Sequence, residues 1–108
     1  MQPSRVVLVT GGAKGVGVGV STRFLAEGAT VIVCGRAAPE QLPEHAGRKA
    51  EFIAADVRDA AARDALFAEI QQRHGRLDVL VNNAGGAPYA MADRASPRFH
   101  ESIIALNL

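Results

Sequence analysis

The sequence predicts an α/β fold in which helices wrap both faces of a parallel sheet. Two observations carry this prediction. Short apolar runs rich in Val and Ile alternate with helix-like segments along the chain, and runs without polar alternation are typical of strands buried on both faces. Right-handed crossovers then give a doubly wound sheet with the strand order 3-2-1-4. No linker or repeat divides residues 1–108, so we expect one domain.

Four segments are predicted to form the strands. The first is 5–10, "RVVLVT", a β-branched run that ends in glycines. The second is 30–34, "TVIVC", and the third is 51–56, "EFIAAD". The Pro-containing stretch 36–49 between them is predicted to be a loop or a short helix. The fourth strand opens the segment "LDVLVNNAG" at 77–85.

A helix is predicted from Gly15 to Ala29, with Gly28 as its stop signal. One face of this helix carries the apolar residues Val16, Val20 and Phe24, and Leu25 lies beside that face.

The second predicted helix has the clearest signals. Asp59 is a suitable N-cap and Gly75 a suitable stop. One face carries its apolar residues: Ala62, Leu66, Phe67 and Ile70.

The segment "SPRFHESIIALNL" at 96–108 is predicted to open a last helix, with Ser96 as N-cap and Pro97 at the first helical position. We expect the sheet to be truncated after its fourth strand and this helix, which leaves the far edge of the fourth strand bare.

Composition limits the classes of function. Twelve basic and eleven acidic residues give a net charge of +1 and are scattered along the chain, so nucleic acid is not an expected partner. The apolar runs are too short for a membrane span or a signal-peptide core, which makes the cytoplasm the expected location. The three histidines are too far apart in sequence for a local metal site, and Cys34 is expected to be a buried, unreactive thiol.

The turn "TGGAKGVG" at 10–17 lies between the first strand and the first helix, where a doubly wound sheet binds a ligand. Gly11 permits a tight turn, Gly15 lets backbone N–H groups approach a pyrophosphate, and Gly17 lets the helix pack closely on the strand. The more familiar G-x-G-x-x-G spacing is absent, as is the acidic residue about 20 positions further on. A glycine-rich turn that only joins a strand to a helix remains the alternative.

Four motifs in this order resemble those of the short-chain dehydrogenase/reductase family, whose fold is of the Rossmann type. The family glycine pattern T-G-x-x-x-G-x-G is matched by the turn at 10–17, and "ADV" at 55–57, "NNAG" at 82–85 and "ALNL" at 105–108 follow. The resemblance implies a cofactor site made by Thr10, Gly11, Gly12, Lys14, Gly15, Val16, Gly17, Arg36, Asp56, Val57, Asn83, Ala84 and Gly85.

The "ADV" motif is suited to adenine. The carboxylate of Asp56 accepts a hydrogen bond from an exocyclic amine, and the N–H of Val57 donates to a neighbouring ring nitrogen. An Asp that simply caps the following turn is the alternative. In the resembled family the Asp contacts adenine, and Asn83 stabilises the sheet, so we expect a packing role for Asn83.

The end of the second strand bears on the choice of cofactor. Gly35 stands where an acid would bind a free ribose 2′-hydroxyl, and Arg36 follows it with donors for a phosphate. Lys14 adds a second positive charge from the glycine turn. The resembled family uses basic residues at these two positions for NADP(H), which is therefore the expected cofactor, with NAD(H) as the alternative. Solvated surface charges are the other interpretation.

Catalysis in the resembled family needs an Asn, a Ser and a Tyr-x-x-x-Lys pair on one helix. Only Asn107 matches this set as a catalytic residue. Tyr89, the sole tyrosine, is followed four residues later by Asp93, which does not lower a Tyr pKa by charge, so Tyr89 is assigned no catalytic role. We expect the 108-residue chain alone to be inactive.

The resemblance implies the amino-terminal part of an NADP(H)-dependent oxidoreductase that interconverts an alcohol and a carbonyl, with a small-molecule substrate and a homodimeric or homotetrameric parent protein. A non-catalytic dinucleotide-binding module is the second hypothesis. A flavodoxin-like FMN binder is a weaker third, because FMN lacks the adenine that Asp56 and Val57 suit.

Overall fold

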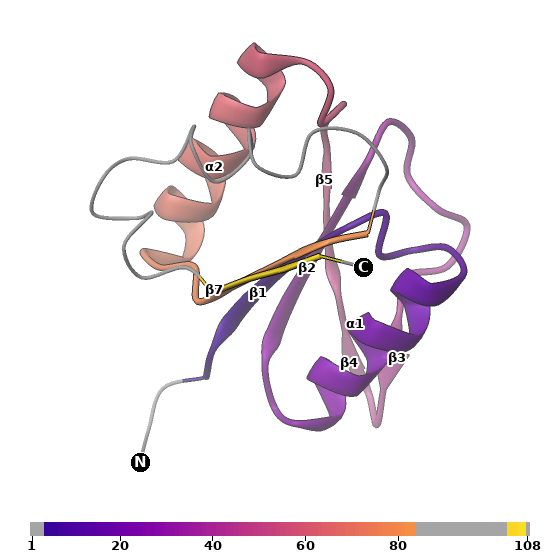
Figure 1. The fold of residues 1–108 in the computed structure, drawn as a ribbon. Helices are drawn as coiled ribbons and strands as arrows, with labels where there is room; N and C mark the ends of the chain where they lie inside the picture. Colours follow the sequence, from indigo (N-terminus) through magenta and orange to yellow (C-terminus); the bar gives the residue numbers. More distant parts are fainter. Residues whose placement is uncertain (1–3, 84–103, 108) are drawn as a thin grey trace.

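Five parallel strands form the central sheet of the computed structural model, which describes residues 4–83 and 104–107 (Figure 1). The strand order is β5-β2-β1-β6-β7. The strands are β1 (Val6–Thr10), β2 (Thr30–Gly35), β5 (Glu51–Ala54), β6 (Val79–Asn82) and β7 (Ile104–Asn107). The first four of these strands in chain order have the predicted arrangement 3-2-1-4, so the predicted topology is confirmed.

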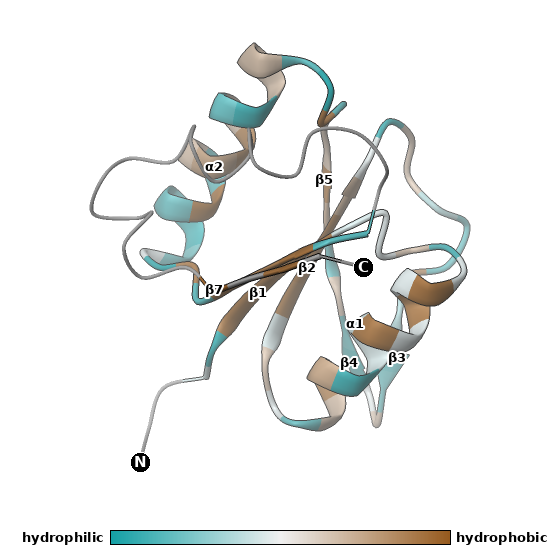
Figure 2. Ribbon diagram, viewed as in Figure 1, coloured by the Kyte–Doolittle hydropathy of each residue, from teal (hydrophilic) through white to brown (hydrophobic). Residues whose placement is uncertain are grey.

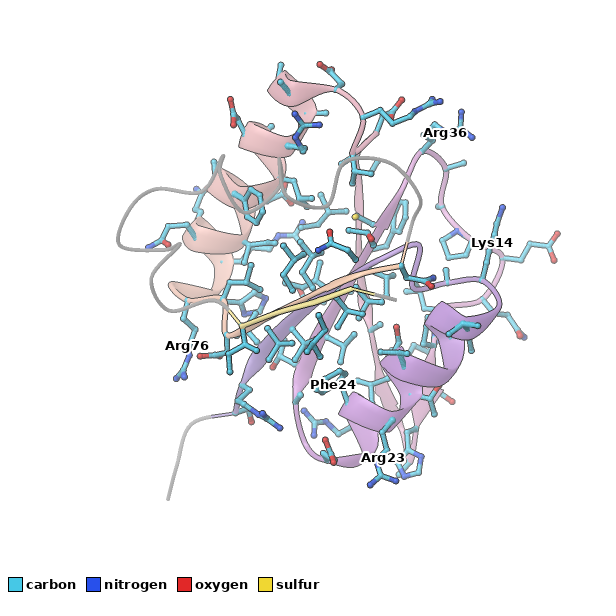
Figure 3. The ribbon with its side chains drawn as sticks, viewed as in Figure 1. Lys14, Arg23, Phe24, Arg36 and Arg76 are labelled. Atoms are coloured by element: carbon cyan, nitrogen blue, oxygen red, sulfur yellow. The ribbon has the colours of Figure 1, made fainter. Side chains whose placement is uncertain are left out.

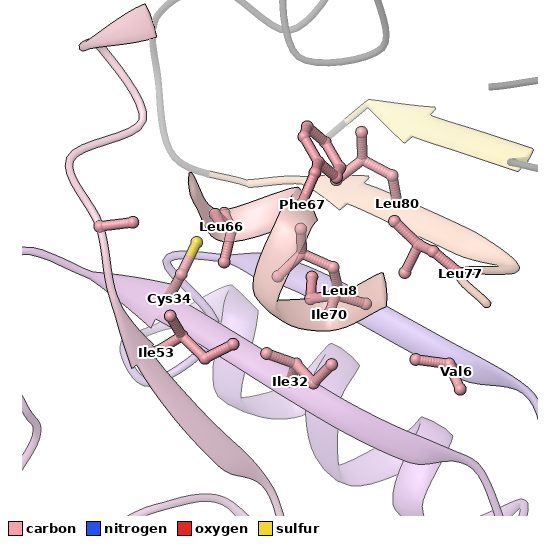
Figure 4. Close-up of a cluster of buried hydrophobic side chains, with 11 residues drawn as sticks. Val6, Leu8, Ile32, Cys34, Ile53, Leu66, Phe67, Ile70, Leu77 and Leu80 are labelled. Carbon is pink, nitrogen blue, oxygen red and sulfur yellow. The ribbon is translucent and has the colours of Figure 1, made fainter. Parts of the chain in front are cut away.

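Helices α1 (Val16–Ala26) and α2 (Ala60–His74) cover opposite faces of the sheet (Figure 1). Every residue of β1 and β6 is buried, and side chains alternate between the faces. On the α2 side, Leu8, Ile32 and Leu80 pack with the helix (Figure 4). On the α1 side, the buried layer is mostly valine, and it contains Val7, Val9, Val31, Val33, Val79 and Val81. Figure 2 shows the resulting hydrophobic centre.

The predicted apolar face of α1 is confirmed in part: Val20 and Phe24 are half-buried against the core and Leu25 is buried, but the prediction is wrong at Val16. Val16 is 68% exposed, and the buried residues of the helix are Gly17, Ser21 and Leu25. These lie four residues apart, on a face turned by one position from the predicted one. Close packing favours small residues here, and the Ser21 hydroxyl donates to the Gly12 carbonyl at 3.1 Å.

The limits of α2 agree with the prediction. The Asp59 side chain accepts a hydrogen bond from the Ala61 N–H at 3.2 Å, and Gly75 ends the helix with φ 73°. The buried face differs at one position, because Arg63 is buried on it and the predicted Ala62 is only half-buried.

The stretch predicted as a loop or short helix contains a hairpin of two short strands, β3 (Glu44–His45) and β4 (Arg48–Lys49). Ala46 and Gly47 both have positive φ, 50° and 83°, as a two-residue hairpin turn requires. A non-glycine residue in this conformation is uncommon, which is why "HAGR" gave no clear signal.

The predicted helix over 96–108 is wrong at residues 104–107, which form β7. This strand pairs in parallel with β6, with Ile104 opposite Val79 and Asn107 opposite Asn82. The prediction of a bare edge on the fourth strand is therefore wrong as well. The free N–H and C=O groups along β6 are satisfied by β7, and the edge of the sheet lies one strand further out. Ser96 and Pro97 lie outside the described residues.

Asp78 joins the amino ends of three strands. Its carboxylate accepts the Val6 N–H at 2.7 Å, its N–H donates to the Val6 carbonyl, and its carbonyl accepts the Ile104 N–H. Arg76 adds hydrogen bonds from Nε and Nη2 to the same carboxylate. Burial acts to raise the pKa of Asp78, but these hydrogen bonds and the charges of Arg76 and Arg5 outweigh it and hold the pKa below its usual value.

Asp78→Ala is expected to lower the free energy of unfolding by about 1–3 kcal/mol, because the partly buried Val6 N–H loses its acceptor. Urea denaturation of both proteins at pH 7 measures this loss. Since the native pKa is lowered, the carboxylate stabilises the fold above its unfolded pKa of about 3.9 and loses this effect as the pH falls further. The exposed Asp64 on α2 provides the control, and an equal loss in Asp64→Ala would contradict the assignment.

Candidate functional site

The glycine turn joins β1 to α1 at the carboxyl end of the sheet. Gly15 is the N-cap of α1 with φ 53°, and no side chain caps the helix. Residues of the turn bond to one another and to β2: the Gly11 N–H donates to the Cys34 carbonyl at 3.1 Å and the Gly17 N–H to the Lys14 carbonyl at 3.0 Å. The positive end of the helix dipole therefore opens onto this edge.

Gly17 is where α1 comes closest to the strand that precedes it. A Cβ on this residue would lie 2.3 Å from the Gly11 carbonyl oxygen and 2.6 Å from Nδ2 of Asn83. No side chain larger than hydrogen fits at these distances. The glycine is required by packing.

Asn83 and Thr10 fasten the turn to β6. Asn83 Nδ2 donates to the Gly11 carbonyl at 3.1 Å, and the Asn83 N–H donates to Thr10 Oγ1 at 3.0 Å. The Thr10 hydroxyl in turn lies 3.4 Å from the Val81 carbonyl, to which it donates. Asn83 thus has the packing contacts that the sequence predicts for it.

Two adjoining cavities lie at this edge. The first has a volume of about 280 Å³ and is lined by Gly11, Cys34, Gly35, Arg36, Ala55, Asp56, Val57 and Arg58. The second, of about 520 Å³, shares Gly11, Gly35 and Arg36 with the first and adds Lys14. Together they bring most of the predicted polar site residues to one place. Arg36 lines both cavities, with Asp56 in the first and Lys14 in the second.

Asp56 is already engaged by Arg58. Its Oδ1 accepts from the Arg58 N–H and Nε, and its Oδ2 accepts from Nη2, all at 3.0 Å. These side-chain hydrogen bonds first, then the backbone one, lower the pKa of Asp56 to about 2, with a further contribution from the charge of Arg36. Asp56 therefore caps the following turn, which was the alternative role considered for it from the sequence. This arrangement leaves a lone pair on Oδ2 for a further donor.

The carbonyl of Val57 has a hydrogen-bond partner, and its N–H has none among the described residues. Its carbonyl accepts from Nη1 of Arg63 at 2.6 Å. Its N–H has no partner in the described parts of the chain, 4–83 and 104–107. A donor at this edge is thus available beside the Asp56 carboxylate.

Lys14 and Arg36 are exposed cations on the same side of the molecule, away from Arg23 and Arg76 (Figure 3). Neither forms an ion pair with any residue that the structure describes. Their charges are not neutralised locally, so an anion in the second cavity would meet both.

Cys34 is a buried free thiol in the wall of both cavities. Burial raises the pKa of this thiol to about 12, although a backbone hydrogen bond from Gly11 acts against the rise. The thiol stays protonated at neutral pH, so the prediction of a buried, unreactive cysteine is supported.

One described site residue, Asn107, is not among the residues that line the two cavities. Asn107 ends β7 instead of lying on a helix, and its backbone is in register with Asn82 at the carboxyl edge of the sheet. Ala84 and Gly85 lie outside the described residues, as does Tyr89.

Two arginines at the site were missed from the sequence. Arg58 follows Asp56 by two residues, a spacing that permits a turn hydrogen bond. Arg63 falls on the stripe that it forms with Leu66, Phe67 and Ile70, where an apolar residue was expected. The helical period was the available signal for Arg63.

In the described ranges, no three His, Cys, Asp or Glu side chains are grouped closely enough to hold a metal ion. Neither described helix has the length and apolar composition to cross a membrane.

Comparison with known proteins places this geometry in a family. A family model described as short chain dehydrogenase matches residues 5–108. A 3beta-hydroxysteroid dehydrogenase of Mediterraneibacter gnavus is 49% identical over 86 residues, which are 75% of this chain and 31% of that protein. The chain thus spans about a third of the length of this relative.

Two solved structures have the same fold and different bound cofactors. The F189W actinorhodin polyketide ketoreductase with NADPH is 40% identical, with a TM-score of 0.68 over 77% of this chain and 34% of that one. The NADH-dependent reductase A1-R′ complexed with NAD is 26% identical, with a TM-score of 0.69 over 85% of this chain and 44% of that one.

Gly17→Ala is expected to destabilise the protein by about 1–3 kcal/mol, because the methyl group meets backbone atoms that must shift. Gly19 on the same helix is the matched control. A Cβ there meets nothing within 4 Å, so no close packing explains this glycine, and Gly19→Ala is expected to stabilise by about 0.5–1 kcal/mol. Thermal unfolding distinguishes the two, and equal shifts would contradict the close approach at Gly17.

Arg58→Ala is expected to return the pKa of the Asp56 carboxyl from about 2 toward its usual value of about 3.9. The variant removes the guanidinium hydrogen bonds and keeps the backbone one. Carbon-detected NMR titration of the Asp side chains measures the change. Arg36→Ala is the comparison and should give a smaller rise, since Arg36 acts only through its charge; the opposite ranking would be inconsistent with the observed pairing.

Proposed function

The chain belongs to the short-chain dehydrogenase/reductase family, and we propose that it is the amino-terminal, cofactor-binding part of an NADP(H)-dependent oxidoreductase. The parent protein would interconvert an alcohol and a carbonyl of a small molecule by hydride transfer. The observation that carries the proposal is the convergence of Lys14, Arg36, Asp56 and the glycine turn on two adjoining cavities.

Adenine recognition is proposed for the first cavity. Its wall offers an acceptor on Asp56 Oδ2 and a donor at the Val57 N–H, which together match the exocyclic amine and the adjacent ring nitrogen of adenine. The pKa of Asp56, lowered by Arg58, keeps the carboxylate ionised, and so an acceptor, under acidic conditions as well as at neutral pH.

The preference for NADP(H) over NAD(H) is proposed for the second cavity. Lys14 and Arg36 line it together, and Gly35 supplies no carboxylate that would repel a phosphate. The guanidinium of Arg36 suits the planar, multidentate recognition of a ribose 2′-phosphate. The glycine turn and the amino end of α1 would receive the pyrophosphate with Gly11, Gly12, Gly15, Val16 and Gly17, beside Thr10, Asn83, Ala84 and Gly85.

The nicotinamide supplies the hydride chemistry when the cofactor is bound. From this chain, Asn107 is the proposed member of the catalytic set. The Ser and the Tyr-x-x-x-Lys pair of the family have no match among its 108 residues, so activity is proposed for the whole parent protein, with the homodimeric or homotetrameric state common in the family and a cytoplasmic location.

A non-catalytic dinucleotide-binding module is the second candidate. It is favoured by one observation, that Asn107 ends a strand rather than lying on a helix. Binding of NADPH without any turnover of alcohols or ketones by the natural full-length protein would support this candidate.

Arg36→Ala is expected to weaken NADPH binding to the chain at least tenfold and to leave NADH binding nearly unchanged. A charge-assisted hydrogen bond of about 1.5–3 kcal/mol corresponds to a change of roughly ten- to a hundredfold. Titration calorimetry with both cofactors measures the two affinities.

Arg23→Ala is the control for this substitution, because Arg23 is an exposed arginine on α1 at the other end of the molecule (Figure 3). Equal losses of NADPH and NADH affinity in Arg36→Ala would argue against recognition of the 2′-phosphate.

A further inference from the structure

Arg63 is a buried cation on the inward face of α2. Only 6% of the residue is exposed, and it shares the buried stripe of the helix with Leu66, Phe67 and Ile70. No described carboxylate pairs with it, and its Nε has no hydrogen-bond partner among residues 4–83 and 104–107. Burying a guanidinium in this state costs free energy that an apolar residue at the same position would avoid. A role beyond packing is therefore indicated.

Among the described residues, the Arg63 guanidinium donates one hydrogen bond, and its acceptor lies at the site. Nη1 donates to the carbonyl of Val57 at 2.6 Å. This carbonyl belongs to the peptide unit between Val57 and Arg58, and the N–H of the same unit donates to Asp56 Oδ1 at 3.0 Å. The peptide unit is thus held at both ends, by Arg63 on the inner side and by Asp56 on the outer side.

A fixed orientation of this peptide unit also limits the orientation of two neighbouring groups, the Asp56 carboxylate and the Val57 N–H. The Arg58 N–H can hold the Asp56 carboxylate in one orientation only while the peptide plane itself does not rotate. The Val57 N–H is separated from the held carbonyl only by the dihedral angles of Val57. The acceptor proposed for adenine is therefore hydrogen-bonded to the peptide unit that Arg63 holds, and the donor is separated from that unit by the Cα of Val57.

We propose that Arg63 is a positioning residue for adenine recognition, acting through the Val57–Arg58 peptide unit to orient Asp56 and Val57. The inference rests on the proposed cofactor site and adds to it a residue from the core of α2. Arg63 itself does not line either cavity, so it acts without touching the nucleotide.

The test uses the 108-residue chain and 5′-AMP, which carries the adenine without the 2′-phosphate or the nicotinamide. Arg63→Met is expected to weaken AMP binding about tenfold, the effect of losing one well-formed hydrogen bond that positions the site. Arg63→Lys keeps a donor for the Val57 carbonyl and is expected to stay within about threefold of the wild type. Calorimetry gives the affinities.

Arg73→Met is the matched control, because it makes the same substitution in the same helix at an exposed arginine whose partners are Glu51 and Glu69. Its affinity for AMP should equal that of the wild type. A loss in Arg73→Met as large as that in Arg63→Met would overturn the proposal, since any change in α2 would then have the same effect.

Amide hydrogen exchange at Arg58, followed by NMR without ligand, gives a second readout. If Arg63 served only to stabilise the fold, its loss would not speed exchange at the Arg58 amide in particular. The exchange is expected to be faster in Arg63→Met and unchanged in Arg63→Lys and Arg73→Met. If Arg63→Met does not fold, Arg63→Lys decides: a folded Lys variant that loses AMP affinity while the Arg58 amide stays protected would overturn the proposal.

The outcomes separate this inference from the proposed function. Wild-type AMP affinity in a folded Arg63→Met overturns the positioning role and leaves the cofactor site intact. Failure of the wild-type chain to bind AMP or NADPH overturns the proposed function and the inference with it.

Discussion

The closeness of α1 to β1 is the constraint on which the rest of the site depends. With 2.3 Å between the Gly11 oxygen and the place where a Gly17 Cβ would be, the helix begins against the backbone of the turn. The inward position one turn later is Ser21, a small residue that bonds to the turn, and only at Leu25 is there room for a large side chain. The amino end of the helix is consequently held at the carboxyl edge of the sheet, where the positive end of its dipole lies.

The central strands behind that edge, β1 and β6, are buried along their whole length. The valine layer under α1 and the larger Leu and Ile side chains under α2 use opposite faces of the same strands, so no strand can slip by one residue without exchanging the two layers. Thr10 and Asn83 continue this order past the last ladder hydrogen bonds of β1 and β6. The loops at the edge therefore start from fixed positions.

The parts of the fold that follow from backbone pattern were predictable, and the parts that depend on tertiary contact were not. Continuous β-branched runs identified β1 and β2, and the Asp59 cap and Gly75 stop identified α2. The most buried line of α1 was misjudged because periodicity favours Val16 and Val20, of which only Val20 packs against the core, whereas the close approach demands Gly17 and Ser21.

Residues 104–107 were predicted as helix by sequence resemblance and local signals, yet these four residues also fit the open edge of β6, and pairing there outweighs helix propensity. At the site, the residue types in the glycine turn and in "ADV" indicated the main groups. The guanidinium partners of Asp56 and Val57 were missed, because the spacing of Arg58 and the helical period of Arg63 only permit these contacts, whose geometry is set once α2 has packed.

The charges at the edge explain how one site can offer both an acceptor for an amine and attraction for phosphates. Asp56 stands two residues beyond Ala54, whose partner across the sheet is Gly35, so a bare carboxylate there would oppose an anion bound beside Arg36. The pairing with Arg58 removes this conflict. It neutralises the charge of Asp56 within the pair while a lone pair on Oδ2 remains for an amine. The charges of Arg36 and Lys14 are then uncompensated among the described residues, and the edge is net positive where a phosphate would lie.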